Sequence, residues 1–174
     1  MAFIPVGTLP ISVAVYPATN KIYVSNNLGR DVTIIDGANN TTTTVTAGRE
    51  PQSLAVTTFT NKIYVASLDN DYVTVIDGTT NLTSMVTIGS GPSTVAVAIN
   101  PVTNKIYVAN NGHANVTVID GPTEITTNVA AEEDPNAVAV NPVSNKIYVT
   151  SIGSKYVTVI DAVTSSTTKV AGDC

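Results

Sequence analysis

Short runs of apolar residues, separated by polar turn residues, follow one another along the whole chain. Within the runs, apolar residues alternate with polar ones or form short blocks, and the three-four spacing of an amphipathic helix is not sustained anywhere. Asn, Asp, Gly and Pro fill the gaps between the runs, where they supply turns. The pattern predicts an all-β protein.

The strand pattern repeats along the chain. The pentapeptide NKIYV begins at Asn20, Asn61, Asn104 and Asn145, at steps of 41, 43 and 41 residues. An element VT-x-ID follows in each copy, and its Asp lies 13 residues after the Tyr of NKIYV. The two extra residues of the third copy lie between Pro92 and Asn104, and an even insertion keeps later side chains on their original face of a strand.

Four short strands fit into each copy. A strand of small residues such as SVAV at 12–15 comes first, KIYV and VT-x-I follow, and a Thr-rich strand such as 41–47 comes last. Ala and Val suit a crowded central axis, Tyr and Ile fill the space between radially arranged sheets, and Thr suits an outer edge that faces water. A repeat of about 42 residues with four strands is typical of a blade, so we predict a β-propeller of four-stranded antiparallel blades.

These repeats define one domain over residues 1–174. The expected blades cover approximately residues 10–48, 51–89, 92–131 and 135–172. Residues 1–10 align with the outer strand and loop at 43–51, which predicts an extra outer strand over 1–7 and makes five outer strands for four blades.

A spare strand and an unpaired blade edge favour pairing with another chain. We therefore expect a homodimer or a higher homo-oligomer, formed by two copies that close an eight-bladed ring or by arcs joined head to tail. An excerpt of a longer parent protein is the competing interpretation.

The motifs P-x-x-VAV-NPV-x-NKIYV-x-N and NVTVIDG resemble the YVTN family of β-propeller repeats, and the resemblance covers almost the whole chain. It implies a radial array of usually about seven or eight four-stranded blades, in prokaryotic surface or secreted proteins that act in binding or assembly. A streptogramin lyase with a similar propeller is the enzymatic precedent. Its catalytic set does not map onto this sequence residue by residue, so no catalytic role is carried over.

The composition of the chain argues against some classes of binding partner. The chain is 43% hydrophobic and 12% charged, and it contains no apolar run long enough to insert into a membrane. A net charge of −5 argues against a nucleic-acid partner, because phosphates require a basic face. The N-terminus lacks the features of a signal peptide. A cytoplasmic location therefore stays open beside the secreted or surface location that the resemblance implies.

The loops at the two ends of the predicted blades differ. At one end they are nearly uniform, whereas at the other end they diverge between copies, which indicates relaxed constraint or a composite binding site. The candidate binding residues on the divergent loops are Arg30, Asp31, Arg49, Glu50, Asp69, Asn70, Asp71, Tyr72, His113, Asn115, Glu132, Glu133, Asp134, Lys155 and Tyr156.

None of these residues completes a catalytic or metal-binding set, so the sequence predicts no catalytic residue, metal or cofactor. His113 is the sole histidine and Cys174 the sole cysteine, whereas a zinc site needs about three or four such ligands. Residues 69–71 resemble a fragment of a calcium loop without its closing Glu. The Asp of VT-x-ID precedes Gly in three copies and is interpreted as part of a tight hairpin, with Asp161 before Ala162 turning less tightly.

The favoured hypothesis is a non-catalytic binding and assembly module. It self-associates through unpaired blade edges and presents the variable loops to a protein or a glycan. One alternative is a propeller enzyme of lyase or hydrolase type, with a site at the central opening that uses His113, Glu133 or Asp134 and a bound metal. The other is a surface carbohydrate-binding protein, for which Tyr72 and Tyr156 are the aromatic candidates.

Overall fold

The computed structural model describes residues 3–88 and 94–171, and these residues form strands, turns and no helix. The first sheet contains β1 (Pro10–Tyr16), β2 (Lys21–Asn26), β3 (Asp31–Asp36) and β4 (Thr42–Thr46). The second contains β5 (Pro51–Thr57), β6 (Lys62–Ser67), β7 (Tyr72–Asp77) and β8 (Thr83–Thr87). The third contains β9 (Thr94–Asn100), β10 (Lys105–Asn110), β11 (Asn115–Asp120) and β12 (Thr126–Ala130). The fourth contains β13 (Pro135–Asn141), β14 (Lys146–Ser151), β15 (Tyr156–Asp161) and β16 (Thr167–Ala171).

Each sheet is antiparallel, and its four strands are paired in chain order, as predicted for propeller blades. The first strand of each sheet begins with a register shift of one residue against its neighbour, for example between Pro10 and Ser12. The third sheet has the same register, because Lys105 pairs with Asn100 just as Lys62 pairs with Thr57. The two extra residues of the third copy therefore precede Thr94 and leave the strands unchanged.

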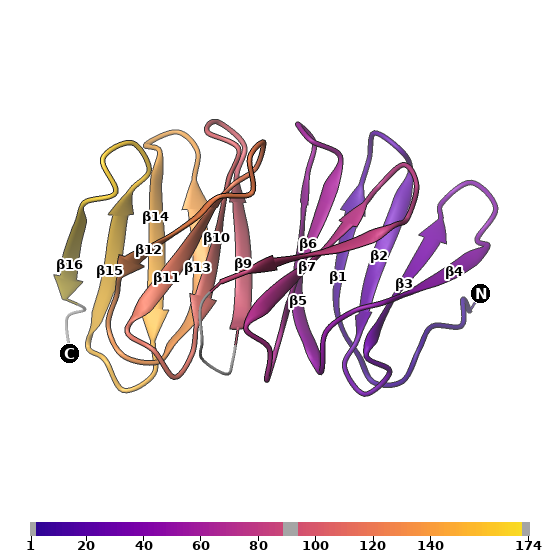
Figure 1. Ribbon diagram of the computed structural model, residues 1–174, viewed down its shortest axis with the longest axis horizontal. Helices are drawn as coiled ribbons and strands as arrows, with labels where there is room; N and C mark the ends of the chain where they lie inside the picture. The colour runs from indigo at the N-terminus through magenta and orange to yellow at the C-terminus, as the bar shows by residue number, and fades with distance from the viewer. Residues whose placement is uncertain (1–2, 89–93, 172–174) are drawn as a thin grey trace.

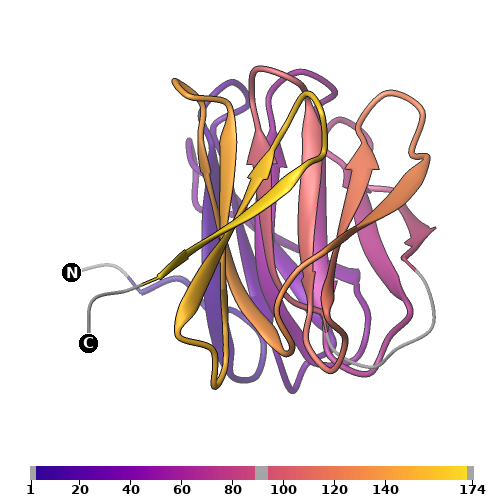
Figure 2. The same ribbon diagram turned by 90° about the vertical axis from the view of Figure 1, so that its left-hand side faces the viewer.

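The four sheets form a fan. The first strands pack beside one another in the order β1, β5, β9, β13 and gather at the middle of Figure 1. From there the first and fourth sheets extend in opposite directions, so that β4 and β16 lie at the two ends of the molecule (Figure 1). Seen along this row from the β16 end, the fourth sheet lies in front of the others (Figure 2). Within the described residues the first and fourth sheets do not pack together, and the fold is a partial propeller.

The apolar core consists of three layers, one between each pair of neighbouring sheets. Because side chains alternate across a strand, the Tyr of KIYV points to one side of its sheet and the Ile and Val point to the other. In the first layer, Tyr23 of the first sheet packs with Leu54, Ile63 and Val65 of the second. We call the side that carries the Tyr the trailing face of a sheet and the side that carries the Ile and Val its leading face. Trailing faces pack on the leading face of the next sheet.

The extra outer strand predicted over 1–7 does not form among residues 3–7, and residues 1–2 lie outside the described residues. The outer strand of a blade pairs with the third strand of the same sheet. The described residues contain no sheet before the first one, so residues 3–7 have no third strand to pair with. Instead, Gly7 donates its amide to Thr33 Oγ1 at 3.3 Å, as Gly48 donates to Thr74 Oγ1 at 3.2 Å. The N-terminal segment thus takes the position of a loop that connects two sheets.

The VT-x-ID carboxylates form turns, but not by the predicted Asp-Gly hairpin. The carboxylate of Asp77 accepts hydrogen bonds from the amides of Thr79 and Thr80. These bonds hold the pKa of the Asp77 carboxyl below its usual range, and the bond from the Thr80 amide contributes most. Asp161 accepts two amides in the same way, each at 2.9 Å, so the prediction of a looser turn there is wrong.

The glycine after the Asp serves close packing rather than a left-handed backbone. A Cβ at Gly121 would lie 2.5 Å from the backbone oxygen of Asn104. The left-handed residue of each turn is instead the fourth one after the Asp, and these residues are Asn40, Asn81, Glu124 and Ser165.

Candidate binding surfaces

The divergent loops meet at one end of the sheets, along the lower edge of Figure 1, as predicted. In the first, second and fourth sheets, the turn between the second and third strands contacts the loop that leads into its own sheet. The amide of Leu68 donates to the carbonyl of Glu50 at 3.1 Å, and the amide of Ile152 donates to the carbonyl of Asp134 at 2.9 Å. We call this end the variable end.

Three of the candidate residues hold the loops in shape. Asp31 accepts a hydrogen bond from Asn26 Nδ2 at 2.6 Å, and Asn115 accepts one from Asn110 Nδ2 at 2.5 Å. Asn70 is buried and donates to the carbonyl of Leu68 at 2.6 Å and to that of Arg49 at 3.2 Å. Their polar atoms are used within the protein, so these residues contribute to loop structure.

Most other candidates are exposed but scattered over different sheets. The exposed ones are Arg30, Arg49, Glu50, Asp69, Asp71, Glu133, Lys155 and Tyr156, and Tyr72 is half-buried. Tyr72 begins β7 in the second sheet and Tyr156 begins β15 in the fourth. Because the third sheet lies between them, the two tyrosines do not form one aromatic platform.

The structure does bring together His113 and the acidic loop that connects the third and fourth sheets. A shallow hollow of about 240 Å³ is lined by residues 112–114 together with Glu133 and Asp134. A second hollow of about 390 Å³ shares these two acids and extends to Ile152, Gly153 and Ser154. Asp134 also accepts the amide of Gly112 at 3.1 Å, which ties the His113 turn to the acidic loop.

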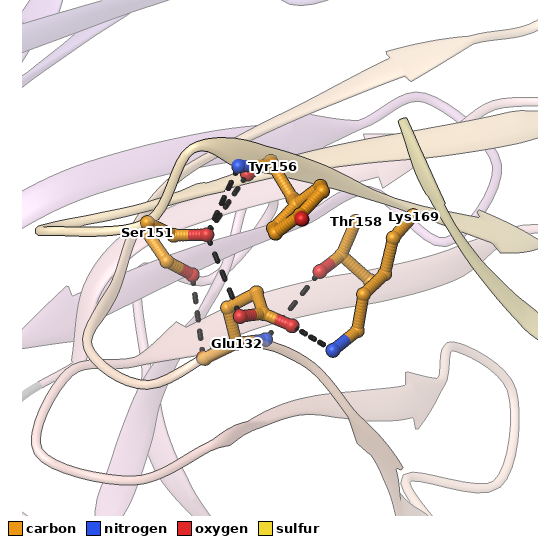
Figure 3. A network of polar contacts seen from close by, with 6 residues as sticks. Glu132, Ser151, Tyr156, Thr158 and Lys169 are labelled. Atoms are coloured by element: carbon orange, nitrogen blue, oxygen red, sulfur yellow. Dashed lines mark hydrogen bonds and ion pairs between the residues drawn. The ribbon is translucent and has the colours of Figure 1, made fainter. Parts of the chain in front are cut away.

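Glu132, the first acid of this loop, is engaged in a network within the fourth sheet (Figure 3). Its carboxylate forms an ion pair with Lys169 and accepts a hydrogen bond from Ser154 Oγ at 3.5 Å. Its amide donates to Thr158 Oγ1 at 3.4 Å, as the amide of Gly48 does to Thr74. The ion pair raises the pKa of the Lys169 ammonium, first through the hydrogen bond and then through the charge of Glu132. Glu132 therefore anchors the loop.

The sequence did not single out Lys169 because its partner lies in another part of the repeat. Lys169 pairs with Thr158 across β15 and β16, and the outer strands of the other sheets place Thr44, Met85 and Asn128 at this position. A charged residue stands at this position in one copy only, and one connecting loop is strongly acidic. These two observations together could have predicted that Lys169 pairs with Glu132.

The chemistry of these hollows is that of a polar binding surface. Within the described residues, no three His, Cys, Asp or Glu side chains gather closely enough to hold a metal ion. His113 Nε2 is enclosed and has no hydrogen-bond partner there, so it is not oriented by a carboxylate as a catalytic base would be. Over the same residues, no helix could span a membrane.

A second candidate surface lies at the two ends of the fan, where one face of an outer sheet is uncovered. On the leading face of the first sheet, Val13 is 64% exposed, whereas its equivalents Leu54 and Val97 are 7% exposed. This face has a mostly apolar hollow of about 230 Å³ beside Val13 and Val24. Two apolar sheet faces that are packed elsewhere in the molecule thus meet solvent at its ends.

The trailing face of the fourth sheet is the second of these uncovered faces. Tyr148 is 37% exposed there, whereas Tyr107 at the same repeat position is 1% exposed. Val170 on β16 is exposed as well, although its equivalents Val86 and Val129 are buried. In the first three sheets the trailing face is covered by the next sheet, whereas in the fourth sheet it is exposed.

The comparisons with known proteins identify the fold alone. No family model and no curated protein matches the chain. Among solved structures, it is similar to a chain of the hydrazine synthase of Kuenenia stuttgartiensis, with a TM-score of 0.81 and 21% sequence identity. The match covers 98% of this chain and 52% of that chain, so this protein spans about half the length of its structural neighbour.

Proposed function

We propose that this protein is a non-catalytic assembly module, a YVTN-like propeller arc whose uncovered sheet faces associate with those of a second copy. One observation carries the proposal. The apolar positions that are buried at three interfaces inside the chain are the same ones that are uncovered at its two ends. Sheet faces, rather than the strand edges expected from the sequence, are the surfaces best suited to association.

The energetics favour covering these faces. Val13 and Val15 are each more than half exposed, and Tyr148 is exposed at the opposite end of the fan. Complete burial of a Val-sized side chain contributes about 1.5–3 kcal/mol. Several such side chains lie at each end, so covering both faces removes a cluster of apolar side chains from water, as at the core of a protein interface.

The shape of the fan supports an eight-bladed ring. The first and fourth sheets extend from the middle in opposite directions (Figure 1). In the proposed ring, a second fan of the same size completes the circle and covers both uncovered sheet faces. The ring would display two copies of the variable end to a protein or glycan partner, at the cell surface or in secreted form.

The native mass of the purified chain tests the proposal. Light scattering over a range of concentrations is expected to give twice the 18.0 kDa of one chain. Val13→Asp places a charge on the leading face and is expected to give a folded monomer. Val143→Asp, at a residue that is 95% exposed in a turn, is the control and is expected to keep the dimer. A wild-type mass of 18.0 kDa at every concentration would overturn the proposal.

A further inference from the structure

We infer that the two copies join head to tail, with the trailing face of the fourth sheet of each copy on the leading face of the first sheet of the other. Lys146 Nζ of one copy then donates to the Gly37 carbonyl and to Asn40 Oδ1 of the second. The inference rests on the proposed function, since it specifies which surfaces of the two copies meet. It names a polar contact that the copies exchange twice.

A related contact recurs at the three interfaces inside the chain. Each sheet begins its second strand with a lysine, and in the first three sheets that lysine reaches the turn between the third and fourth strands of the next sheet. Lys21 Nζ donates to the Gly78 carbonyl at 2.7 Å and to Asn81 Oδ1 at 3.1 Å. Lys105 Nζ donates to the Ala162 carbonyl at 3.1 Å.

Lys62, the corresponding lysine of the second sheet, forms an ion pair with the turn of the third sheet. Lys62 Nζ lies 2.6 Å from Glu124 Oε1, and Glu124 occupies the turn position that Asn81 occupies in the second sheet. Both side chains are about a quarter to a third exposed, so the pair is screened and is worth little on its own. It shows that the turn position accepts either an amide or a carboxylate as the partner of the lysine.

Lys146 is the fourth lysine of the series, and no sheet follows its own within residues 3–88 and 94–171. No described residue accepts a hydrogen bond from its ammonium group. The first sheet carries the matching acceptors, because Gly37 and Asn40 stand in its turn where Gly78 and Asn81 stand in the second sheet. Asn40 has the same left-handed backbone, with φ at 62° against 60° at Asn81.

A second polar contact follows the same rule. At two of the three interfaces between sheets, the residue that ends the first strand bonds to the Asn of NKIYV in the next sheet. At the other interface Tyr16 ends the first strand, and Asn61 Oδ1 has no hydrogen-bond partner among the described residues. Thr57 Oγ1 donates to Asn104 Oδ1 at 2.8 Å, and Asn100 Nδ2 donates to Asn145 Oδ1 at 2.5 Å. In the fourth sheet this residue is Asn141, and its counterpart in a second copy is Asn20.

The apolar layers agree with this direction of packing. Inside the chain, a trailing face with its Tyr always meets a leading face with its Ile and Val. Head-to-tail pairing sets Tyr148 against Val13 and Val24, as Tyr23 is set against Leu54 and Val65. Two leading faces would instead lack the Tyr, and two trailing faces would lack the Ile and Val and would leave the Gly37 and Asn40 acceptors without Lys146.

Mixing two charge variants tests the inference. Asn40→Lys sets two ammonium groups against each other, and Lys146→Glu sets a carboxylate against a carbonyl and an amide oxygen, so each variant alone is expected to dimerise at least about tenfold more weakly. In an equimolar mixture, one interface joins Glu at 146 to Lys at 40 and the other is that of the wild type. The mixture is therefore expected to form a heterodimer of near wild-type affinity.

A second variant keeps the test independent of folding defects. Asn40→Asp tolerates the left-handed backbone and creates an ion pair like that of Lys62 and Glu124, so it is expected to tighten the dimer, most clearly at low salt. Lys155→Glu, an exposed charge at the variable end, is the charge-matched control and is expected to leave the affinity unchanged.

The outcomes separate the two proposals. A wild-type chain that stays monomeric overturns the proposed function and the inference together. A wild-type dimer with single variants of unchanged affinity, or with weakened variants that do not recover on mixing, overturns head-to-tail pairing alone. If Asn40→Lys does not fold, the result for Asn40→Asp decides, and an unchanged affinity for that variant counts against the inference.

Discussion

At the scale of single residues, left-handed backbone conformations recur at fixed places in the repeat. One of them lies in the turn between the second and third strands of a sheet, where Gly112 and Gly153 have φ values of 84° and 77°. In the first sheet the left-handed residue of this turn is Arg30, one residue before β3, with φ at 58°, and a side chain there costs about 1 kcal/mol or more. Its exposed side chain offers no packing in return.

Arg30→Gly is therefore expected to stabilise the protein by up to about 1 kcal/mol, because the strain removed exceeds the added flexibility of the unfolded chain. Arg30→Ala is the control and should bring no gain, since Ala keeps the Cβ that causes the strain. Urea unfolding at one fixed protein concentration measures both changes. Equal midpoints for the Gly and Ala variants would contradict the explanation.

The buried tyrosines give the stability a defined dependence on pH. Burial, with a smaller contribution from neighbouring charges, raises the pKa of Tyr23 and of Tyr64 from 10.0 to about 12. Between pH 10 and about 12 the unfolded chain releases phenolic protons that the native state keeps. The contribution to stability is thus complete below pH 10 and is lost as the pH rises through this window.

Denaturant unfolding between about pH 9 and 12 is expected to show this decline, with tyrosinate absorbance appearing as the protein unfolds. Tyr64→Phe should make the decline shallower. It should not destabilise the protein at neutral pH, because Tyr64 Oη is buried without a hydrogen-bond partner among the described residues. A stability that stays constant up to pH 12 would refute the assignment.

At the scale of strands and sheets, most of the fold could be predicted from the sequence. The alternation of apolar and polar residues and the spacing of NKIYV and VT-x-ID located four antiparallel sheets in the described part of the chain. The alternation could not show that residues 3–7 lack a strand, because a strand depends on a neighbour that local sequence does not supply. For the same reason it predicted which loops share the variable end but not the pairing of Glu132 with Lys169.

A matched pair of substitutions measures what the covering of a sheet contributes. Ile106 and Ile22 occupy the same repeat position, but Ile106 is fully buried between two sheets whereas Ile22 is only half-buried on the uncovered leading face. Ile106→Ala is expected to cost about 2–5 kcal/mol, as large-to-small changes in a core do. Ile22→Ala should cost roughly half as much or less in dilute solution. Equal costs in dilute solution would mean that the first sheet is already covered.

At the scale of the whole molecule, the sequence favoured an open arc because of a spare outer strand, and that strand does not form among residues 3–7. Four repeats are compatible with a closed four-bladed ring or with an open arc, and both bury Tyr, Ile and Val between sheets. The choice depends on the angle between neighbouring sheets, which is set by the bulk of side chains such as Tyr64 and Ile106 where they meet, and not by the repeat pattern. The open arc leaves apolar faces at both ends, so the proposed association would be coupled to folding.

This coupling predicts that stability depends on protein concentration. Association removes the uncovered faces from water in the native state only, so mass action raises the melting temperature as concentration rises. Scanning calorimetry over a hundredfold range of concentration is expected to show this increase for the wild type and not for Val13→Asp. The cost of Ile22→Ala should grow over the same range, because its leading face is covered only in the assembly, whereas that of Ile106→Ala should stay constant. A constant cost for Ile22→Ala, together with a constant wild-type melting temperature, would show that the faces remain open to solvent.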